Sequence, residues 1–159
     1  MRAFWICMVV ACGCSTQWKQ PTVQAEPASD IRVCSSIEGV DTAVRSWDYA
    51  LGNWRRMALT TDSCDVRIDQ GSCESNTAIA CTDGLGGQSI TIQKRLTSGN
   101  ATHVIAHEMG HVLGAQRVSG TLMDLREDAS PFDCPDKTTM AQVAAYHRIN
   151  IELLRYCWR

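Results

Sequence analysis

Two histidines four residues apart, with a glutamate directly after the first, are the residues of this chain best suited to chemistry. They lie in the stretch His107-Glu108-Met109-Gly110-His111. On an α-helix, residues i and i+4 project from the same face, so both imidazoles can reach a single cation. Glu108 would then lie close to a water molecule held by that cation. The stretch therefore predicts a site for one Zn²⁺ ion, with His107 and His111 as ligands and Glu108 as general base.

Two further histidines lie outside this pattern. His103 precedes His107 by one helical turn, but eight residues separate it from His111, which is about 12 Å along a helix axis. Three histidines spread over that length cannot share one ion. We therefore expect His103 to be exposed or hydrogen-bonded near the start of the helix. His147 has no neighbour at metal-ligand spacing, and we expect a surface or core role for it.

The helix that carries the motif has a predictable beginning and end. Asn100 and Thr102 are both of the types that cap helix N-termini. The helix should run through the motif to about Leu113. Gly114 then offers the left-handed conformation in which many helices end.

An earlier amphipathic helix is indicated by apolar residues at spacings of three and four. Asp41 is of a type that caps such a helix. The apolar stripe is rich in tryptophan and is more typical of a core face than of a binding surface. It consists of Val44, Trp47, Leu51, Trp54 and Ala58.

The middle of the chain changes to the alternating period of β-strands. Apolar and polar residues alternate over 66–69 and 90–93, and residues 77–81 form a weaker candidate. Farther on, Thr139-x-x-Gln142 resembles a capping box. It would open a last helix whose apolar residues include Val143, Tyr146, Ile149 and Leu153. The order helix, strands, helix, irregular segment, helix predicts an α+β fold with one sheet covered by helices.

Length and charge limit the classes of protein that fit. The chain has 159 residues, enough for one domain with a single core, which we place at residues 31–159. The formal net charge is −2 with interspersed signs, so no nucleic-acid partner is indicated. No stretch of about 20 apolar residues is present, so no segment is expected to span a bilayer. We expect a monomer.

The N-terminus has the pattern of an export signal. Met1-Arg2 is a short positive start and residues 3–11 form an apolar run of signal-peptide length. The residues that follow resemble a bacterial lipoprotein signal, in which a lipidated cysteine becomes the first mature residue: Cys14 or, alternatively, Cys12. We expect a signal over 1–13, a flexible tether over 14–30, and a cell-envelope protein that touches the membrane only through its lipid anchor. An ordinary secretory signal, giving a secreted protein, is the alternative.

Cysteine usage agrees with export. The chain has nine cysteines, and cleavage before Cys14 leaves six beyond it. An even set in an exported domain predicts three disulfides, and the absence of C-x-x-C spacing argues against a cysteine metal site. Fifteen connectivities are open. The six residues are Cys34, Cys64, Cys73, Cys81, Cys134 and Cys157.

The region from His107 onward resembles the metzincin clan of zinc endopeptidases, most closely its matrixin-like branch. The clan signature is His-Glu-x-x-His-x-x-Gly-x-x-His or Asp, followed by a methionine turn beneath the metal. His107, Glu108, His111 and Gly114 match it, and Gly120-Thr121-Leu122-Met123 looks like the turn. The motif matches cover about residues 103–124, and the rest agrees only in the order of elements.

The resemblance implies a fold and an activity. The fold would be a twisted mixed sheet covered by the N-terminal and active-site helices, with a C-terminal helix after the methionine turn. The activity would be hydrolysis of peptide bonds in peptide or protein substrates by a metal-activated water, with Glu108 as base. Gly114 would turn the chain towards a third ligand, and Met123 would form a hydrophobic floor without ligating. An edge strand near residues 77–81 would hold an extended peptide by main-chain pairing.

The chain departs from the family at the third ligand, where it has Arg117. A guanidinium has no lone pair to offer, and its repulsion of a dication about 4 Å away is roughly 8 kcal/mol at an effective dielectric near 20. It should therefore turn towards solvent or towards Glu108 or Asp124.

Several alternatives follow for the site. Asp124, Glu127 or Asp128 could supply the third ligand, or water could complete a weak two-histidine site. A different zinc clan would use a downstream glutamate, here Glu152. The remaining alternative is a catalytically impaired module whose cleft binds a peptide without cutting it.

Overall fold

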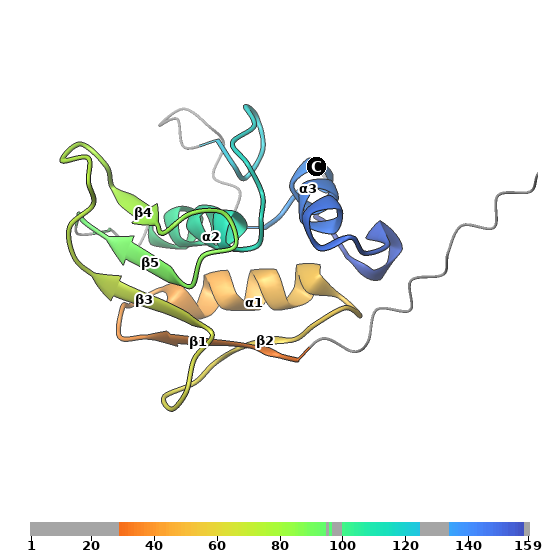
Figure 1. Ribbon diagram of the computed structural model, residues 1–159, viewed down its shortest axis with the longest axis horizontal. Helices are drawn as coiled ribbons and strands as arrows, with labels where there is room; N and C mark the ends of the chain where they lie inside the picture. Colours follow the sequence, from red (N-terminus) through yellow and green to blue (C-terminus); the bar gives the residue numbers. More distant parts are fainter. Residues whose placement is uncertain (1–28, 95, 97–99, 125–133, 158–159) are drawn as a thin grey trace, which may run out of the picture.

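The computed structural model describes residues 29–94, 96, 100–124 and 134–157. They form an α+β fold with a mixed five-stranded sheet and three α-helices (Figure 1). The predicted signal with Cys12 and Cys14, most of the predicted tether, and Glu127 and Asp128 lie outside the described residues. No described helix is long and apolar enough to cross a membrane.

The sheet has the strand order β2-β1-β3-β5-β4. The first four strands in this order run parallel to their neighbours, and β4 is antiparallel to β5 at the edge. The strands are β1 (Ile31–Ser35), β2 (Met57–Leu59), β3 (Val66–Gln70), β4 (Ala80–Thr82) and β5 (Ser89–Ile92). Strands were predicted over the regions of β3 and β5, which is confirmed, and the weaker candidate at residues 77–81 overlaps β4.

The predicted order of elements was wrong at its start, because β1 precedes the first helix. α1 (Val40–Leu51) also differs from the expected helix at both ends. It begins after Gly39, which has φ 87°, so Asp41 lies in the first turn. It ends at Gly52, where φ is 60° and a Cβ would lie 2.5 Å from the Leu153 carbonyl oxygen. Trp54 is still buried, but it lies beyond the helix.

Two positions explain why the apolar spacing extends beyond the end of α1. Ala58 belongs to β2 and is exposed. Trp54 reaches the core from the turn after α1. It therefore fits the spacing of apolar residues in a helix, although its backbone is not helical.

α1 and α2 (Ala101–Val112) lie side by side on one face of the sheet (Figure 1). Trp47 is fully buried between them, and its indole N–H donates to the Ala106 carbonyl over 2.9 Å. The tryptophan stripe is therefore core, as predicted. This bond fixes α2 at the residue directly before His107.

α3 (Lys137–His147) lies at the other end of the molecule from β4 (Figure 1). Its N-cap is Asp136, whose carboxylate accepts from the backbone N–H groups of Thr138 and Thr139. The predicted capping box was wrong, because the Gln142 side chain instead accepts from the backbone N–H of Gln116. The helix ends at Arg148 in a left-handed conformation, so the predicted apolar positions 149 and 153 lie beyond it.

The six cysteines of the folded region form three disulfides, as predicted. The pairs are Cys34–Cys64, Cys73–Cys81 and Cys134–Cys157. Each disulfide joins two cysteines that follow one another among the six. This pairing is one of the fifteen connectivities that the sequence left open.

Candidate metal centre

α2 places the histidine motif inside the molecule. Nine of its twelve residues are buried, as expected for a helix packed on several sides. It begins after Asn100 and its C-cap is Leu113, in agreement with the prediction. Gly114 follows with φ 89°, the expected left-handed turn.

The two motif histidines meet through their Nε2 atoms, which are 3.1 Å apart. His107 is fully buried and His111 is partly buried. Each ring is held from behind by a backbone carbonyl. The Leu122 oxygen lies 3.1 Å from Nδ1 of His107, and the Ala115 oxygen lies 2.8 Å from Nδ1 of His111.

These contacts determine where each ring carries its proton. A carbonyl oxygen only accepts hydrogen bonds, so Nδ1 of each ring must be the donor. In a neutral imidazole the lone pair is then on Nε2. Burial lowers the pKa of His107 to about 3 and also lowers the pKa of His111, so both rings are neutral at pH 7. Two lone pairs thus face each other.

This arrangement fits a zinc ion. Tetrahedral Zn²⁺ with Zn–N bonds of about 2.0–2.1 Å separates two nitrogen ligands by about 3.3 Å, close to the 3.1 Å between the two Nε2 atoms. Without a cation, two lone pairs at this distance repel each other. Carbonyl acceptors behind the ligating rings are the usual means of orienting histidine ligands.

Glu108 lies beside this pair in a poorly hydrated position. It is 2% exposed, and burial raises the pKa of its carboxyl group to about 7, against a smaller opposing effect of the Arg117 charge. A pKa near the working pH suits a group that must both accept and release a proton.

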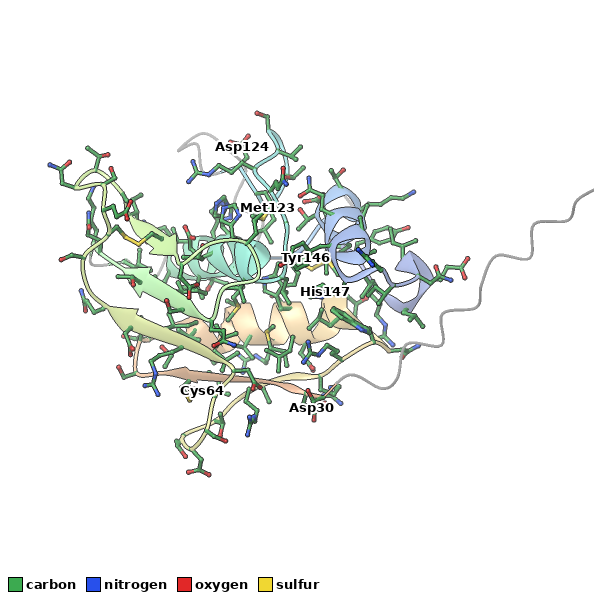
Figure 2. All side chains as sticks on the ribbon, in the orientation of Figure 1. Asp30, Cys64, Met123, Asp124, Tyr146 and His147 are labelled. Atoms are coloured by element: carbon green, nitrogen blue, oxygen red, sulfur yellow. A yellow bond between two sulfur atoms is a disulfide. The ribbon has the colours of Figure 1, made fainter. Side chains whose placement is uncertain are left out.

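The predicted methionine turn packs against the motif helix. Met123 is 1% exposed, and its thioether lies so close to Gly110 that a side chain there would overlap it. The turn is held by Asp136, which accepts from the backbone N–H of Leu122 over 2.9 Å, while the Leu122 carbonyl faces His107. Figure 2 shows Met123 and Asp124 on the segment that passes over α2.

The described residues do not supply an evident third ligand. Within the described ranges, no three His, Cys, Asp or Glu side chains gather as a metal-holding group. Asp124 is buried and accepts from the backbone N–H of Gly120 over 2.7 Å. Glu152 is exposed and its carboxylate accepts from the Asn150 side chain. Both carboxylates therefore have structural partners.

A cavity of about 540 Å³ lies over the motif, and we call it the cleft. Glu108, His111 and Arg117 line it, and so do all three residues of β4. The Cys73–Cys81 disulfide also lies in its wall. Because β4 pairs only with β5 among the described strands, its other edge is open for main-chain pairing.

The other two histidines lie outside the pair that His107 and His111 form. His103 is half-buried in the first turn of α2. His147 packs its ring against Trp54, with centroids 4.6 Å apart, and its Nε2 is buried without a partner among the described atoms. Figure 2 shows His147 and Tyr146 on the inner side of α3.

Some parts of the site carry no sequence signal. The Leu122 and Ala115 carbonyls orient the histidines, but backbone groups are the same in every residue. Tyr146, counted among the apolar residues of the last helix, is 48% exposed, and its ring lies against Gly114. Its hydroxyl donates to the Leu85 carbonyl over 3.4 Å, which links α3 to a loop that lines the cleft.

No protein-family model matches this chain, and no curated protein matches it in sequence. The resemblance to metzincins therefore depends on the motif residues and on what their geometry permits.

Proposed function

We propose that the protein is a zinc-dependent endopeptidase of metzincin-like fold. One observation supports this most strongly: two neutral imidazoles present their Nε2 lone pairs to each other, and one of them, His111, lines the cleft together with the buried carboxyl group of Glu108. His107 and His111 would hold the ion through Nε2. When bound, Zn²⁺ would polarise a water molecule and the scissile carbonyl group.

The residues of the chain divide the remaining tasks. Glu108 accepts a proton from the attacking water and passes it to the leaving amine, for which its raised pKa is suited. The free edge of β4 aligns an extended peptide across the cleft by main-chain hydrogen bonds. The Leu122 carbonyl holds the His107 ring through its Nδ1, and Met123 packs against the motif helix at Gly110.

Zinc content and cleavage, measured together, test this function. We expect the oxidised protein to retain about one zinc per chain after dialysis and to cut unstructured protein substrates. Glu108→Gln should retain the zinc and lose about 10²–10⁴-fold in kcat/KM. The matched control is Glu38→Gln, an exposed glutamate outside the cleft, which should leave both unchanged. Cleavage by Glu108→Gln at the normal rate would refute the mechanism.

A peptide-binding module without catalysis is the second candidate. The observation that favours it is Arg117 in the position of the third ligand, together with the lack of a three-residue ligand group among the described residues. A protein that holds no zinc and cuts nothing, yet binds peptides in the cleft, would establish this alternative.

We further propose that the chain is exported and anchored through a lipidated cysteine, Cys14 or Cys12. Three disulfides support export, because such bonds persist in oxidising compartments. Mass spectrometry of the mature N-terminus tests the anchor: a diacylglyceryl cysteine is expected, and an unmodified terminus would contradict it.

A further inference from the structure

Arg117 places a positive charge in the wall of the cleft, next to the groups proposed to do the chemistry. It lines the same cavity as Glu108 and His111, and its side chain is exposed. No hydrogen bond or ion pair joins its guanidinium to another residue of the described part of the chain. The sequence predicted that Arg117 turns towards solvent or towards Glu108 or Asp124, and of these its side chain takes the exposed position.

The acidic residues of the cleft do not form an ion pair with this guanidinium. They are Glu74 and Glu108. Glu74 is exposed and makes no ion pair with Arg117. Glu108 is 2% exposed and makes no ion pair with Arg117 either. The cleft therefore has room for an anionic group from outside.

The guanidinium lies within electrostatic reach of the reacting groups. Arg117 lines the cavity together with Glu108 and His111, and its positive charge acts on both of them. An anion seated beside Arg117 would thus lie near the bond to be cut. It would also offset the repulsion between Arg117 and a dication.

We propose that Arg117 forms a carboxylate subsite. The cleft would then select peptides that carry an acidic side chain or a free C-terminal carboxylate close to the peptide bond that lies next to Glu108. That these peptides are substrates rests on the proposed function, but carboxylate binding itself needs neither metal nor catalysis. A guanidinium pairs with a carboxylate through two parallel N–H···O bonds, which neither an amide nor an ester reproduces with the same charge. The open edge of β4 binds the main chain of the peptide, and Arg117 binds its carboxylate.

Four labelled peptide pools test the subsite. Each pool has random uncharged flanks and an uncharged dye, with a central Glu or Gln and a free or amidated C-terminus. Their dissociation constants are measured by fluorescence anisotropy on the metal-free, oxidised full chain, so that no cleavage occurs. The variants are Arg117→Gln and, as a matched control, Arg67→Gln, an exposed arginine on β3 outside the cleft.

We expect at least one carboxylate-bearing pool to bind about 10–100-fold more tightly than the pool with Gln and an amidated C-terminus, the range of a charge-assisted hydrogen bond. Arg117→Gln should abolish this preference and Arg67→Gln should retain it. Preference for central Glu identifies an acidic side chain, and preference for the free C-terminus identifies a terminal carboxylate.

Three results would overturn the subsite: equal binding of all four pools, no measurable binding of any pool, or a preference that survives Arg117→Gln. Failure of the proposed function is a separate result, since it appears as absent zinc and absent cleavage. A chain without zinc that still prefers carboxylates through Arg117 would be a carboxylate-selective binding protein.

Discussion

At the scale of single residues, the candidate site combines two groups whose titrations change the stability of the fold with pH in opposite directions. His107 is held neutral in the fold, with a pKa of about 3, because its ring is buried. Its contribution to stability is complete above the ordinary pKa of about 6.5 and is lost as the pH falls towards 3. Glu108 has a raised pKa of about 7, so its contribution is complete below its ordinary pKa of 4.5 and is lost as the pH rises through 7. Between pH 5 and 7 the two effects offset each other.

Substitutions should separate these effects in the metal-free protein. When the pH falls from 7.5 to 5, we expect the free energy of unfolding of Glu108→Gln to decrease by about 2 kcal/mol more than that of the unaltered protein, because only the histidine effect remains. The free energy of unfolding of His107→Gln should decrease less than that of the unaltered protein. Urea unfolding at the two pH values, with chelator present, measures both changes. Parallel pH dependences for all three proteins would show that these groups titrate normally.

Arg117 permits a second prediction at this scale. Arg117→Gln removes a positive charge beside the ion, and Arg117→His also restores the third ligand implied by the resemblance. We expect Arg117→Gln to bind Zn²⁺ at least about tenfold more tightly than the unaltered chain, and Arg117→His more tightly still. Competition with a chromogenic chelator measures the affinities. If Arg117→His binds no better than Arg117→Gln, position 117 does not reach the ion.

At the scale of elements, the end of α2 depends on a close contact with α3. Gly114 has φ 89°, and a side chain there would overlap the Tyr146 ring, whereas Gly120 has φ 74° and open space around it. Gly120→Ala should therefore cost only about 1 kcal/mol, the usual penalty for the left-handed region. Gly114→Ala should cost more than about 2 kcal/mol because the clash is added. Thermal unfolding compares them, and equal losses would mean that the ring moves freely.

The elements also show what the sequence could and could not predict. The motif helix, Gly114, and the strands near residues 66–69 and 90–93 follow from local period and capping, and the structure confirms them. β1 and β2 were missed because short strands in a parallel sheet are recognised mainly by their partners. The predicted end of α1 was wrong because Trp54 is buried although it lies in a turn. The spacing of apolar residues indicates which side chains are buried, and it does not show whether the backbone is helical.

At the scale of the whole molecule, the disulfides add stability by restricting the unfolded chain. Cys34–Cys64 spans 30 residues and Cys73–Cys81 spans 8. In the chain-entropy model, these loops correspond to about 3.5 and 2.5 kcal/mol respectively. The double-serine variant of Cys34–Cys64 should therefore be less stable than that of Cys73–Cys81 by about 1 kcal/mol, as urea unfolding would measure. The reverse order would show that strain or packing, and not loop length, decides their value.

The site itself was only partly predictable at this scale. The sequence identified His107, Glu108, His111, Gly114 and Met123 as candidates and Arg117 as the departure. It could not show that the Nε2 atoms face each other, since that depends on carbonyls 4 and 15 residues away from the rings they orient. It also could not show that the Cys73–Cys81 disulfide lines the cleft beside β4.

The parallel sheet has a consequence for how quickly the chain folds. Its strand pairs join distant residues, such as Ile31 with Met57 and Val33 with Val66. Pairings of this kind form slowly, on a scale of about milliseconds to seconds, because a long loop must close before any contact is gained. Cys34 lies in β1 and Cys64 lies just before β3, so their bond closes that loop in advance. The oxidised chain should refold faster than the reduced chain, which would leave unpaired strand edges exposed to aggregation for longer.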